Sequence, residues 1–374
     1  MSEYDYLVVG AGLFGAVFVD QAKKVGKKCL VIDKRNHIGG NCFTENIEGI
    51  EVHKYGAHIF RTNSKEIWAY LNSFDEFNNF INSPLAFYKG KLFNLPFNMN
   101  TFYQIWGLTT PEQVERKIAE QRGEIGKKDI ENLEEKAISL VGRDVYEILI
   151  KGYTEKQWGR ECRDLPSSII RRLPFRLTFD NNYFNDRYQG VPEHGYTYII
   201  NKMLEGAKIN LNVNFNADRD NWIKKAKKII YTAPIDELCD YKYGPLEYRG
   251  LFFQHKVLNE RNHQGVAVVN FTEKEVPYTR KIEHKHFVFG TQEKTVVSWE
   301  YPSKWNVGDD PYYPINDENN NSKYKRYLQL VRQEYPNIKV GGRLGQYQYF
   351  DMQDTINQAL ELAKSEKLVS SFIL

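Results

Sequence analysis

The order of hydrophobic and polar positions predicts an α/β opening at the N-terminus. Residues Tyr4 to Val9 form a short apolar run of the kind found in buried strands. Apolar positions at helical spacing follow from Ala16 to Val25, and a second apolar run from Lys28 to Ile32 ends at Asp33. We therefore predict one strand-helix-strand unit at the start of the chain.

The middle of the chain has helical periodicity from about Thr101 to Arg172, which predicts a helical insertion. A further helix is expected from Ser64 to Phe74, and another from Asn132 through Leu140. Three capping patterns mark helix starts: Asn63 with Glu66, Thr110-Pro-Glu-Gln113, and Asn132.

The second half of the chain returns to strands. Lys227 to Thr232 is a buried-type strand that predicts a return to the first domain. Alternating positions between Tyr248 and Ser303 predict an antiparallel sheet with strands at Val266 to Phe271, Thr279 to Phe289 and Thr295 to Tyr301. A polar loop at Asp317 to Ser322, a helix, a strand at Ile338 to Val340 and a last helix from Asp354 to Ser365 are expected to follow.

A glycine-rich turn joins the first strand to the first helix. Gly10, Gly12 and Gly15 allow a tight turn, close approach to a pyrophosphate and close helix packing, and the phosphate would lie at the helix N-terminus. Asp33 ends the next strand, where a carboxylate can accept hydrogen bonds from a ribose. Alone the glycine pattern is weak, but this context predicts a dinucleotide site.

Two later segments favour FAD over NAD. Asp33 is followed by Lys34-Arg-Asn-His-Ile-Gly39-Gly40-Asn41, which resembles the second FAD-contact motif of the glutathione-reductase-like flavoproteins. Gly341-Gly342-Arg343 resembles the segment that returns to the isoalloxazine ring in that group, although a plain strand-to-helix turn would also explain it.

The predicted fold class is α/β, with a discontinuous Rossmann-like FAD-binding domain, a helical insertion domain and an antiparallel β-sheet domain. We assign residues 1–78, 191–240 and 335–374 to the FAD-binding domain, 79–175 to the helical domain, and 176–190 with 241–334 to the antiparallel sheet domain.

Composition and charge narrow the class of protein. The 374 residues carry 51 Lys and Arg against 48 Asp and Glu, a net charge of +3 that does not indicate a nucleic-acid binder. No apolar run reaches the roughly 18 residues of a membrane span, and no leader pattern opens the chain. The scattered cysteines predict neither a disulfide framework nor a zinc site: Cys29, Cys42, Cys162 and Cys239. We expect a cytoplasmic protein without a bound metal.

A set of longer motifs resembles, in order, the bacterial UDP-galactopyranose mutases and covers essentially the whole chain. These motifs are Tyr55-Gly56-Ala57-His58-Ile59-Phe60, Asn94-Leu-Pro96-Phe97-Asn98, Lys151-Gly152-Tyr153-Thr-Glu-Lys-Gln-Trp158-Gly159, Arg171-Arg172-Leu-Pro174, Asp180-Asn-Asn-Tyr183-Phe184, Val276-Pro-Tyr-Thr-Arg280, Tyr312-Tyr313-Pro314 and Gly342-Arg343-Leu344.

The resemblance implies a redox-neutral ring contraction of UDP-galactopyranose to UDP-galactofuranose on reduced FAD. In the family's scheme the flavin N5 attacks the anomeric carbon and expels UDP, the sugar ring opens and recloses through O4, and UDP returns. A Ser, Cys or Lys nucleophile is then not required. The resemblance also implies a UDP-sugar as partner, NAD(P)H or another reductant for the flavin, a homodimer, and a role in cell-surface polysaccharide synthesis.

Roles of single residues follow from the same resemblance. On the substrate side, Arg172 and Arg280 would hold the diphosphate, since guanidinium groups bind phosphate oxygens bidentately. Tyr183, Tyr313 and Tyr349 would donate hydroxyls to phosphate and sugar, and Tyr153 and Trp158 would stack on the uracil. Asn82, Phe184 and Asp351 join them, although Asp351 could instead cap the last helix.

On the cofactor side, the resemblance implies that Arg343 favours the anionic reduced flavin and that His58 lies against the flavin face. These two residues, with Arg172 and Arg280, are the expected catalytic set. The remaining expected cofactor contacts are Gly10, Gly12, Phe14, Gly15, Asp33, Lys34, Gly39, Gly40, Asn41 and Gly342.

One position departs from the family pattern. The family usually has a second histidine where this chain has Arg61. A solvent-facing exchange would explain it. Alternatively, the several donors of Arg61 point toward a sugar substituent such as a 2-acetamido group, so that UDP-N-acetylgalactosamine would also be a substrate.

Two other classes of protein share the cofactor motifs. A flavin amine-oxidase-like oxidoreductase needs an apolar substrate tunnel instead of converging Arg and Tyr side chains. A GDP-dissociation-inhibitor-type module has a degraded flavin site, whereas the glycines here are intact.

Overall fold

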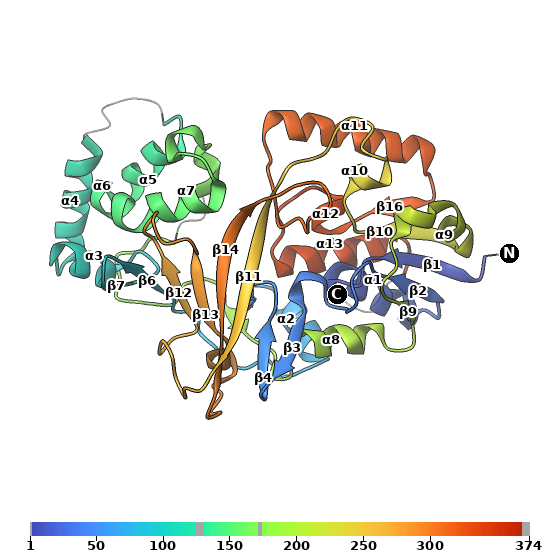
Figure 1. The fold of residues 1–374 in the computed structure, drawn as a ribbon, viewed down its shortest axis with the longest axis horizontal. Helices are drawn as coiled ribbons and strands as arrows, with labels where there is room; N and C mark the ends of the chain where they lie inside the picture. The colour runs from blue at the N-terminus through green and yellow to red at the C-terminus, as the bar shows by residue number, and fades with distance from the viewer. Residues whose placement is uncertain (1, 124–129, 171–173, 369–374) are drawn as a thin grey trace.

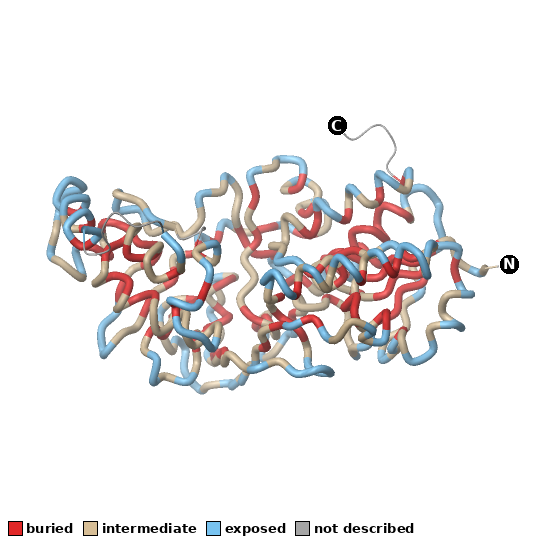
Figure 2. The backbone as a smooth tube through the Cα atoms, turned by 90° about the horizontal axis from the view of Figure 1, so that it is seen from above, coloured by how far each residue is buried: buried red, intermediate tan, exposed pale blue. Residues whose placement is uncertain are grey.

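The computed structural model describes residues 2–123, 130–170 and 174–368. The molecule is elongated, with a parallel sheet and its helices at one end, a second sheet in the middle and a group of helices at the other end (Figure 1). Buried residues fill the interior of both ends, and exposed positions lie on the outer helices (Figure 2). Within the described ranges, no helix is long and apolar enough to cross a membrane.

A five-stranded parallel sheet forms one end of the molecule, which we call the parallel-sheet end. Its order is β16 (Ile338–Val340), β10 (Ala226–Tyr231), β1 (Tyr4–Val9), β2 (Cys29–Ile32) and β9 (Lys208–Asn210). Alternate residues of β1 enter different cores: Tyr6 and Val8 pack on one face of the sheet, Leu7 and Val9 on the other. Burial on both faces explains why these strands appear as continuous apolar runs.

Helices cover both faces of this sheet. On one face lie α1 (Leu13–Lys24), α8 (Gly195–Leu204) and α13 (Met352–Ser365). On the other lie α9 (Arg219–Lys225), α10 (Ile235–Leu238) and α11 (Glu318–Glu334). The predicted strands at 4–9, 28–32, 227–232 and 338–340 are confirmed to within one residue.

A seven-stranded sheet occupies the middle of the molecule. Its order is β15 (Tyr313–Pro314), β11 (Tyr248–Leu258), β14 (Thr295–Lys304), β13 (Arg280–Glu283), β12 (Val268–Phe271), β6 (Leu85–Tyr88) and β7 (Lys91–Asn94). The predicted strand at 295–301 is present in β14. Because β12 and β6 pair in parallel, the sheet is mixed and not purely antiparallel.

Two segments differ from their predicted domains. β6 and β7 come from the segment 79–175 predicted as helical, and they join the sheet because β6 pairs with β12. In the segment 176–190 predicted as part of the sheet, β8 (Tyr188–Gly190) pairs instead with β5 (Phe60–Thr62) in a separate two-stranded ladder.

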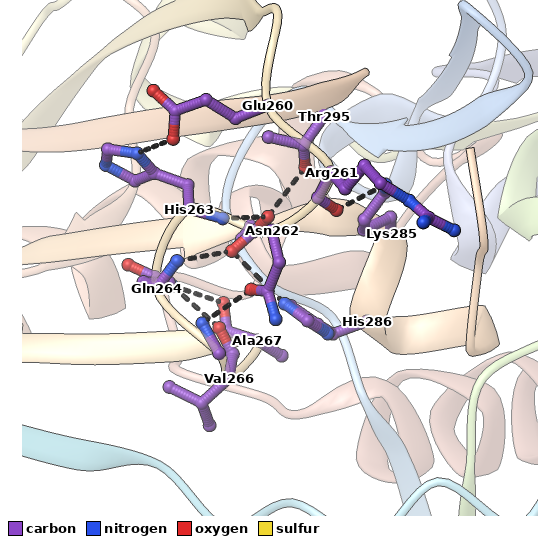
Figure 3. A network of polar contacts seen from close by, with 12 residues as sticks. Glu260, Arg261, Asn262, His263, Gln264, Val266, Ala267, Lys285, His286 and Thr295 are labelled. Carbon is purple, nitrogen blue, oxygen red and sulfur yellow. Dashed lines mark hydrogen bonds and ion pairs between the residues drawn. The ribbon is translucent and has the colours of Figure 1, made fainter. Parts of the chain in front are cut away.

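The predicted strand from Thr279 to Phe289 is wrong in its second half. β13 ends at Glu283, and a 3₁₀ turn runs from His284 to Val288. The buried Glu283 carboxylate accepts hydrogen bonds from the His263 and Gln264 amides and the Thr295 hydroxyl. The Lys285 ammonium donates to the Arg261 and Gln292 carbonyls. Figure 3 shows Lys285 and His286 turned toward the 260–267 loop. The chain after Glu283 therefore contacts this loop and does not continue the β-ladder.

The predicted loop at 317–322 is also wrong. Asp317 caps α11 by accepting a hydrogen bond from the Asn320 amide at 2.8 Å. α11 was expected in the sheet domain, but Tyr327, Leu330 and Val331 pack into the core of the parallel sheet. Its apolar face therefore assigns it to the parallel-sheet end of the molecule.

The helical end has its own core. It comprises α3 (Met99–Trp106), α4 (Pro111–Gly123), α5 (Leu133–Val141), α6 (Arg143–Val145), a π-helical turn (Tyr146–Lys151) and α7 (Gly152–Trp158). The caps predicted at Thr110 and Asn132 are confirmed. For α2 (Lys65–Asn72), however, the cap is the Ser64 hydroxyl, not Asn63, whose side chain accepts from Arg187 instead.

The remaining short elements complete the chain. They are the hairpin β3 (Thr44–Ile47) and β4 (Ile50–His53), α12 (Gly342–Gly345), and 3₁₀ turns at Gly40–Cys42, Cys162–Asp164, Ser167–Ile170 and Phe215–Asp218.

Candidate active site

One cavity of about 730 Å³ lies where the parallel sheet, the mixed sheet and the helical end meet. Its lining begins at the carboxyl ends of β1, β2 and β10, where ligands bind in open α/β sheets, and continues to β13, β14 and α7. The structure brings together around it these residues singled out in the sequence: Gly10, Gly12, Phe14, Asp33, Lys34, Gly39, Gly40, Asn41, His58, Arg61, Asn82, Tyr153, Trp158, Tyr183, Phe184, Arg280, Tyr313, Gly342, Arg343, Tyr349 and Asp351.

Two expected site residues are not in that lining. Gly15 lies behind the glycine turn, where an added Cβ would come within 2.2 Å of the Gly10 carbonyl oxygen. Gly15 thus allows the helix to pack closely on the turn. Arg172 lies outside the described residues.

The glycine turn and Asp33 form one unit. Gly10 has φ +110°, a conformation that favours glycine. The Asp33 carboxylate accepts hydrogen bonds from the Ala11 amide at 2.7 Å and the Arg35 amide at 2.9 Å. These contacts fix Asp33 at the end of β2, where it is part of the cavity lining and has lone pairs left to accept further hydrogen bonds.

The second glycine pair lies against the first turn. The Gly39 amide donates to the Ala11 carbonyl at 2.8 Å, and a Cβ on Gly40 would be 3.0 Å from the Gly12 Cα. A Cβ on Gly341 would be 2.3 Å from the Phe14 ring. Gly341 thus allows close packing on Phe14, while glycines from all three segments line the cavity with backbone, which fits a dinucleotide: Gly10, Gly12, Gly39, Gly40 and Gly342.

The basic residues after Asp33 are held by a loop of the mixed sheet. Lys34 and Arg35 form ion pairs with Asp310 at 3.3 and 2.9 Å. Arg35 also donates to the Asn41 side chain and lies over the Tyr55 ring, 4.4 Å from its centroid. These contacts connect the predicted cofactor motif with the 305–312 loop.

His58 is held as a neutral imidazole. Burial lowers the pKa of His58 to about 4. Its Nδ1 lies 2.8 Å from the Gly56 carbonyl, so Nδ1 carries the hydrogen and Nε2 is left as an acceptor. Gly56 has φ +103°, and the Phe253 ring would lie 3.4 Å from a Cβ there. The loop geometry at His58 therefore depends on Gly56.

A chain of hydrogen bonds supports this loop from behind. The His58 amide donates to His53 Nδ1 at 3.1 Å, and the His53 amide donates to His284 Nδ1 at 3.2 Å. His284 Nε2 therefore carries a hydrogen and donates to the Ser298 hydroxyl at 2.6 Å, which in turn contacts His255 at 2.6 Å.

Arg343 approaches the same region from α12. Its guanidinium donates to the Tyr312 carbonyl at 2.6 Å and lies over the Tyr349 ring, 5.2 Å from its centroid. Its buried Nε has no hydrogen-bond partner within the described part of the chain. A fixed positive charge with a spare donor therefore lies in the cavity wall.

Arg280 forms an ion pair with Glu300, which the sequence analysis missed. Arg280 Nε lies 3.2 Å from Glu300 Oε1, and the Glu300 side chain is 1% exposed. Although burial opposes the charge, Glu300 holds the pKa of Arg280 well above its usual value. The signal was a lone carboxylate between Trp299 and Tyr301 in a predicted strand.

Tyrosine hydroxyls surround this ion pair. Burial raises the pKa of Tyr153 to about 12 and also raises the pKa values of Tyr183 and Tyr313. These hydroxyls therefore stay protonated and can donate hydrogen bonds. The Tyr313 and Tyr349 rings are 5.7 Å apart.

Arg61 is fixed by two carboxylates. Its terminal nitrogens contact Asp186 at 2.7 Å and Asp351 at 3.1 Å, and its guanidinium lies over the Phe184 ring, 4.9 Å from the centroid. A simple solvent-facing exchange does not describe this half-buried side chain. Asp351 also caps α13, which was the alternative expected for it, and it lines the cavity; its contact with the substrate stays a prediction.

The far end of the cavity is mostly apolar. Tyr153 and Trp158 come from α7, and neighbouring side chains are Phe97, Leu149, Ile150 and Ile169. Asn82 lies nearby, where its carbonyl accepts from the Tyr183 amide at 2.8 Å. An aromatic ring fits this apolar end.

Several polar atoms in the cavity wall were not foreseen. Gln157 Oε1, Asn270 Oδ1 and Gln353 Oε1 are buried and lack a hydrogen-bond partner among the described residues. Buried polar groups are usually paired, so these atoms fit a polar ligand. Among the residues described, no group of three His, Cys, Asp or Glu is placed to hold a metal ion.

Comparison with known proteins identifies the family. The family model described as UDP-galactopyranose mutase matches residues 148–349, and a model for an NAD(P)-binding Rossmann-like domain matches residues 8–74. A Klebsiella pneumoniae protein named "Probable UDP-galactopyranose mutase" is 36% identical, over 97% of this chain and 94% of its own. An Escherichia coli dTDP-fucopyranose mutase is 34% identical, over 96% and 97%.

Solved structures show the same fold. A reduced UDP-galactopyranose mutase matches with a TM-score of 0.75 at 15% identity, over 98% of this chain and 96% of that one. A putrescine oxidase matches with a TM-score of 0.57 at 12% identity, over 97% and 99%. The predicted α/β fold with a Rossmann-like domain is confirmed. The chain belongs to the UDP-galactopyranose mutase family and is a mutase, that is, an isomerase.

Proposed function

We propose that this enzyme interconverts UDP-galactopyranose and UDP-galactofuranose and that it uses reduced FAD as its cofactor. One observation carries the proposal. A single cavity joins the glycine-lined cradle to a wall of Arg280, Arg343 and tyrosine hydroxyls, with an apolar aromatic end beyond them. A dinucleotide and a nucleotide sugar can therefore meet in it. The names of the family model and of the Klebsiella pneumoniae relative support this substrate.

The cofactor site fits FAD. Gly12, Gly40 and Gly342 provide bare backbone in the cavity wall, Asp33 provides a ribose acceptor, and Arg343 provides a fixed positive charge. When bound and reduced, FAD supplies the electron pair that displaces UDP from the anomeric carbon, a task for which the chain presents no recognisable Ser, Cys or Lys nucleophile motif.

The chain's own residues bind and orient the nucleotide sugar. Arg280, held by Glu300, receives the diphosphate as negative charge develops on it. Neutral His58 offers an acceptor at Nε2, and Tyr153 and Trp158 hold the base. Arg172 is a second diphosphate arginine on the strength of the family resemblance.

Two further substrates belong to the proposal. The dTDP-fucopyranose mutase of Escherichia coli is nearly as similar to this chain as the Klebsiella pneumoniae relative. Arg61 has five N–H donors, and its two carboxylate contacts leave others for a 2-acetamido carbonyl, so UDP-N-acetylgalactosamine is a candidate.

We also propose a cytoplasmic homodimer that takes electrons from NAD(P)H or another reductant and provides furanose for cell-surface polysaccharide.

The test is anaerobic turnover of purified, flavin-loaded enzyme with and without dithionite. We expect UDP-galactofuranose to yield UDP-galactopyranose only after reduction, as resolved by chromatography. UDP-N-acetylgalactosamine and dTDP-fucopyranose are run in parallel. If the enzyme converts only dTDP-fucopyranose, the proposed UDP-sugar substrate is wrong. If the enzyme consumes oxygen with an amine, it is an oxidase and the proposed function is wrong.

A further inference from the structure

The base-binding helix and the diphosphate arginine lie on separate parts of the chain. Tyr153 and Trp158 belong to α7 in the helical end, whereas Arg280 opens β13 of the mixed sheet. A nucleotide that contacts all three residues spans this boundary. The affinity for it therefore depends on how the loop of residues 272–279, between β12 and β13, is placed against α7.

Lys156 of α7 binds that loop. Its Nζ donates to the carbonyls of Phe271 at 2.7 Å, Val276 at 3.0 Å and Tyr278 at 2.9 Å. An ammonium has three N–H donors, so each one has an acceptor. The first carbonyl belongs to the last residue of β12, and the other two belong to the loop that leads into Arg280.

The backbone of the loop also approaches α7 closely. A Cβ on Gly152 would lie 2.3 Å from the Thr272 carbonyl oxygen. The Thr272 hydroxyl donates to the Ile148 carbonyl at 2.7 Å, and Lys274 pairs with Glu155 at 3.1 Å. Lys156 therefore contributes the half-buried charge of a tight junction between helix and loop, whereas the Lys274 side chain is 65% exposed and its ion pair contributes little.

We propose that Lys156 is a positioning residue that sets the placement of Arg280 relative to Tyr153 and Trp158, and so the affinity for the nucleoside diphosphate part of the substrate. This inference rests on the proposed function. Lys156 does not have to touch the nucleotide, because it acts through the loop that it holds.

The protonation of Lys156 adds a readout that ordinary packing would not give. A neutral amine has two N–H donors and a lone pair, so it would leave one carbonyl unbonded. Burial lowers the pKa of Lys156 to about 8, although the negative charges of Glu273 and Glu275 act to raise it. The other nearby charges are Glu155 and Lys274, which pair with each other. We therefore expect UDP affinity to fall as the pH rises from 7 to 9.

The experiment measures binding of UDP to the flavin-loaded enzyme by calorimetry, and KM and kcat for UDP-galactofuranose, at pH 7 and 9. Lys156→Met should weaken UDP binding about tenfold or more at pH 7, raise KM in parallel and change saturated kcat by less than about threefold. Its remaining affinity should be the same at pH 9. Lys274→Met, an exposed lysine of the same junction, is the matched control and should bind UDP like the wild type.

Three outcomes would overturn the inference: UDP binding by Lys156→Met within twofold of the wild type, an equal loss in Lys274→Met, or an unchanged pH dependence in Lys156→Met. If Lys156→Met does not fold, Lys156→Arg is the deciding variant, because the charge of arginine persists at pH 9. A loss of UDP affinity between pH 7 and 9 as large as that of the wild type would count against the inference. Failure of wild-type enzyme to bind UDP would overturn the proposed function itself.

Discussion

Arg280 and Glu300 are the residue pair on which the proposed diphosphate site depends. Glu300 is almost fully buried, and its carboxylate holds the guanidinium in the cavity wall. Guanidinium binds phosphate oxygens as a planar fork, which an ammonium cannot imitate. The pair therefore fixes both the charge and the orientation of the site.

Replacing Arg280 should cripple turnover without loss of the cofactor. Arg280→Ala removes a charge-assisted contact to phosphate, on the order of 1.5–3 kcal/mol or about 10- to 100-fold in kcat/KM. Arg280→Lys should restore little of it. The flavin absorbance of the purified protein should stay normal, and the exposed Arg261→Ala is the control. Near-normal rates in Arg280→Ala would show that the diphosphate binds elsewhere.

Asp33 should matter for the cofactor and not for the sugar. Asp33→Ala removes the charged acceptor for the ribose and also frees the Ala11 and Arg35 amides. We expect the dissociation constant of FAD to rise about tenfold or more. The measurement is the flavin-to-protein absorbance ratio after dialysis. Asp5→Ala, at the opposite end of the neighbouring strand β1, should retain flavin. Full occupancy in Asp33→Ala contradicts the assignment.

Arg61 should select among sugars if its spare donors meet a 2-acetamido group. Arg61→His would then lower kcat/KM for UDP-N-acetylgalactosamine about tenfold or more while the galactose reaction is largely kept. The measurement is a pair of specificity constants under dithionite for wild type and variant. Equal losses for both sugars, or no wild-type reaction with UDP-N-acetylgalactosamine, would show that Arg61 only ties Asp186 to Asp351.

At the scale of elements, the junction of β4, the 284–288 turn and β14 holds uncharged histidines. Burial lowers the pKa of His53 to about 3 and the pKa of His284 well below its usual value. Between these values and the ordinary 6.5 or so, the unfolded chain binds more protons than the folded one. This stabilisation is therefore present above about pH 6.5 and is lost as the pH falls.

The free energy of unfolding should drop between pH 7 and pH 5, on the order of 2 kcal/mol for each fully buried imidazole. Asp236, whose pKa is raised by burial to about 6, opposes the trend. A variant comparison separates the two: His284→Asn should show a smaller drop than the wild type in urea titrations. The hydrogen bond to Asp75 raises the pKa of the exposed His194, so His194→Asn should instead show a larger drop. An identical pH dependence in His284→Asn would show that His284 binds protons in the folded protein as it does in the unfolded chain.

Elements stabilised by local sequence were predictable, and those decided by distant partners were not. β1, β2 and β10 are buried on both faces, so their apolar runs were clear in the sequence. β13 ends because Glu283 is bound by amides about twenty residues away in the chain, and β6 is in the sheet only because β12 pairs with it. Neither partner can be read from a local window of sequence.

At the scale of the whole molecule, the cavity is built where three cores meet. The long motifs placed most of its wall in advance because they carry unusual residues in a fixed order. Glu300, Asn270 and Gln157 escaped notice, since a single polar residue in a strand or helix has no pattern of its own. Only the packed structure shows that they face a common space.

This arrangement predicts that cofactor and nucleotide stabilise the protein together. The cofactor and the nucleotide would occupy one cavity, and the 305–312 loop connects the cofactor cradle to the mixed sheet through Asp310. UDP at about 100 times its Kd should add roughly 2.7 kcal/mol of stability to the flavin-loaded enzyme. The gain should be smaller at the same UDP concentration after FAD is stripped, because the wall is then less ordered and binding costs more.

Thermal unfolding with and without UDP, for loaded and stripped protein, measures the difference. Re-addition of FAD should restore the full shift. Equal shifts in the two forms would mean that the nucleotide site is complete without the cofactor and that the two halves of the cavity act independently.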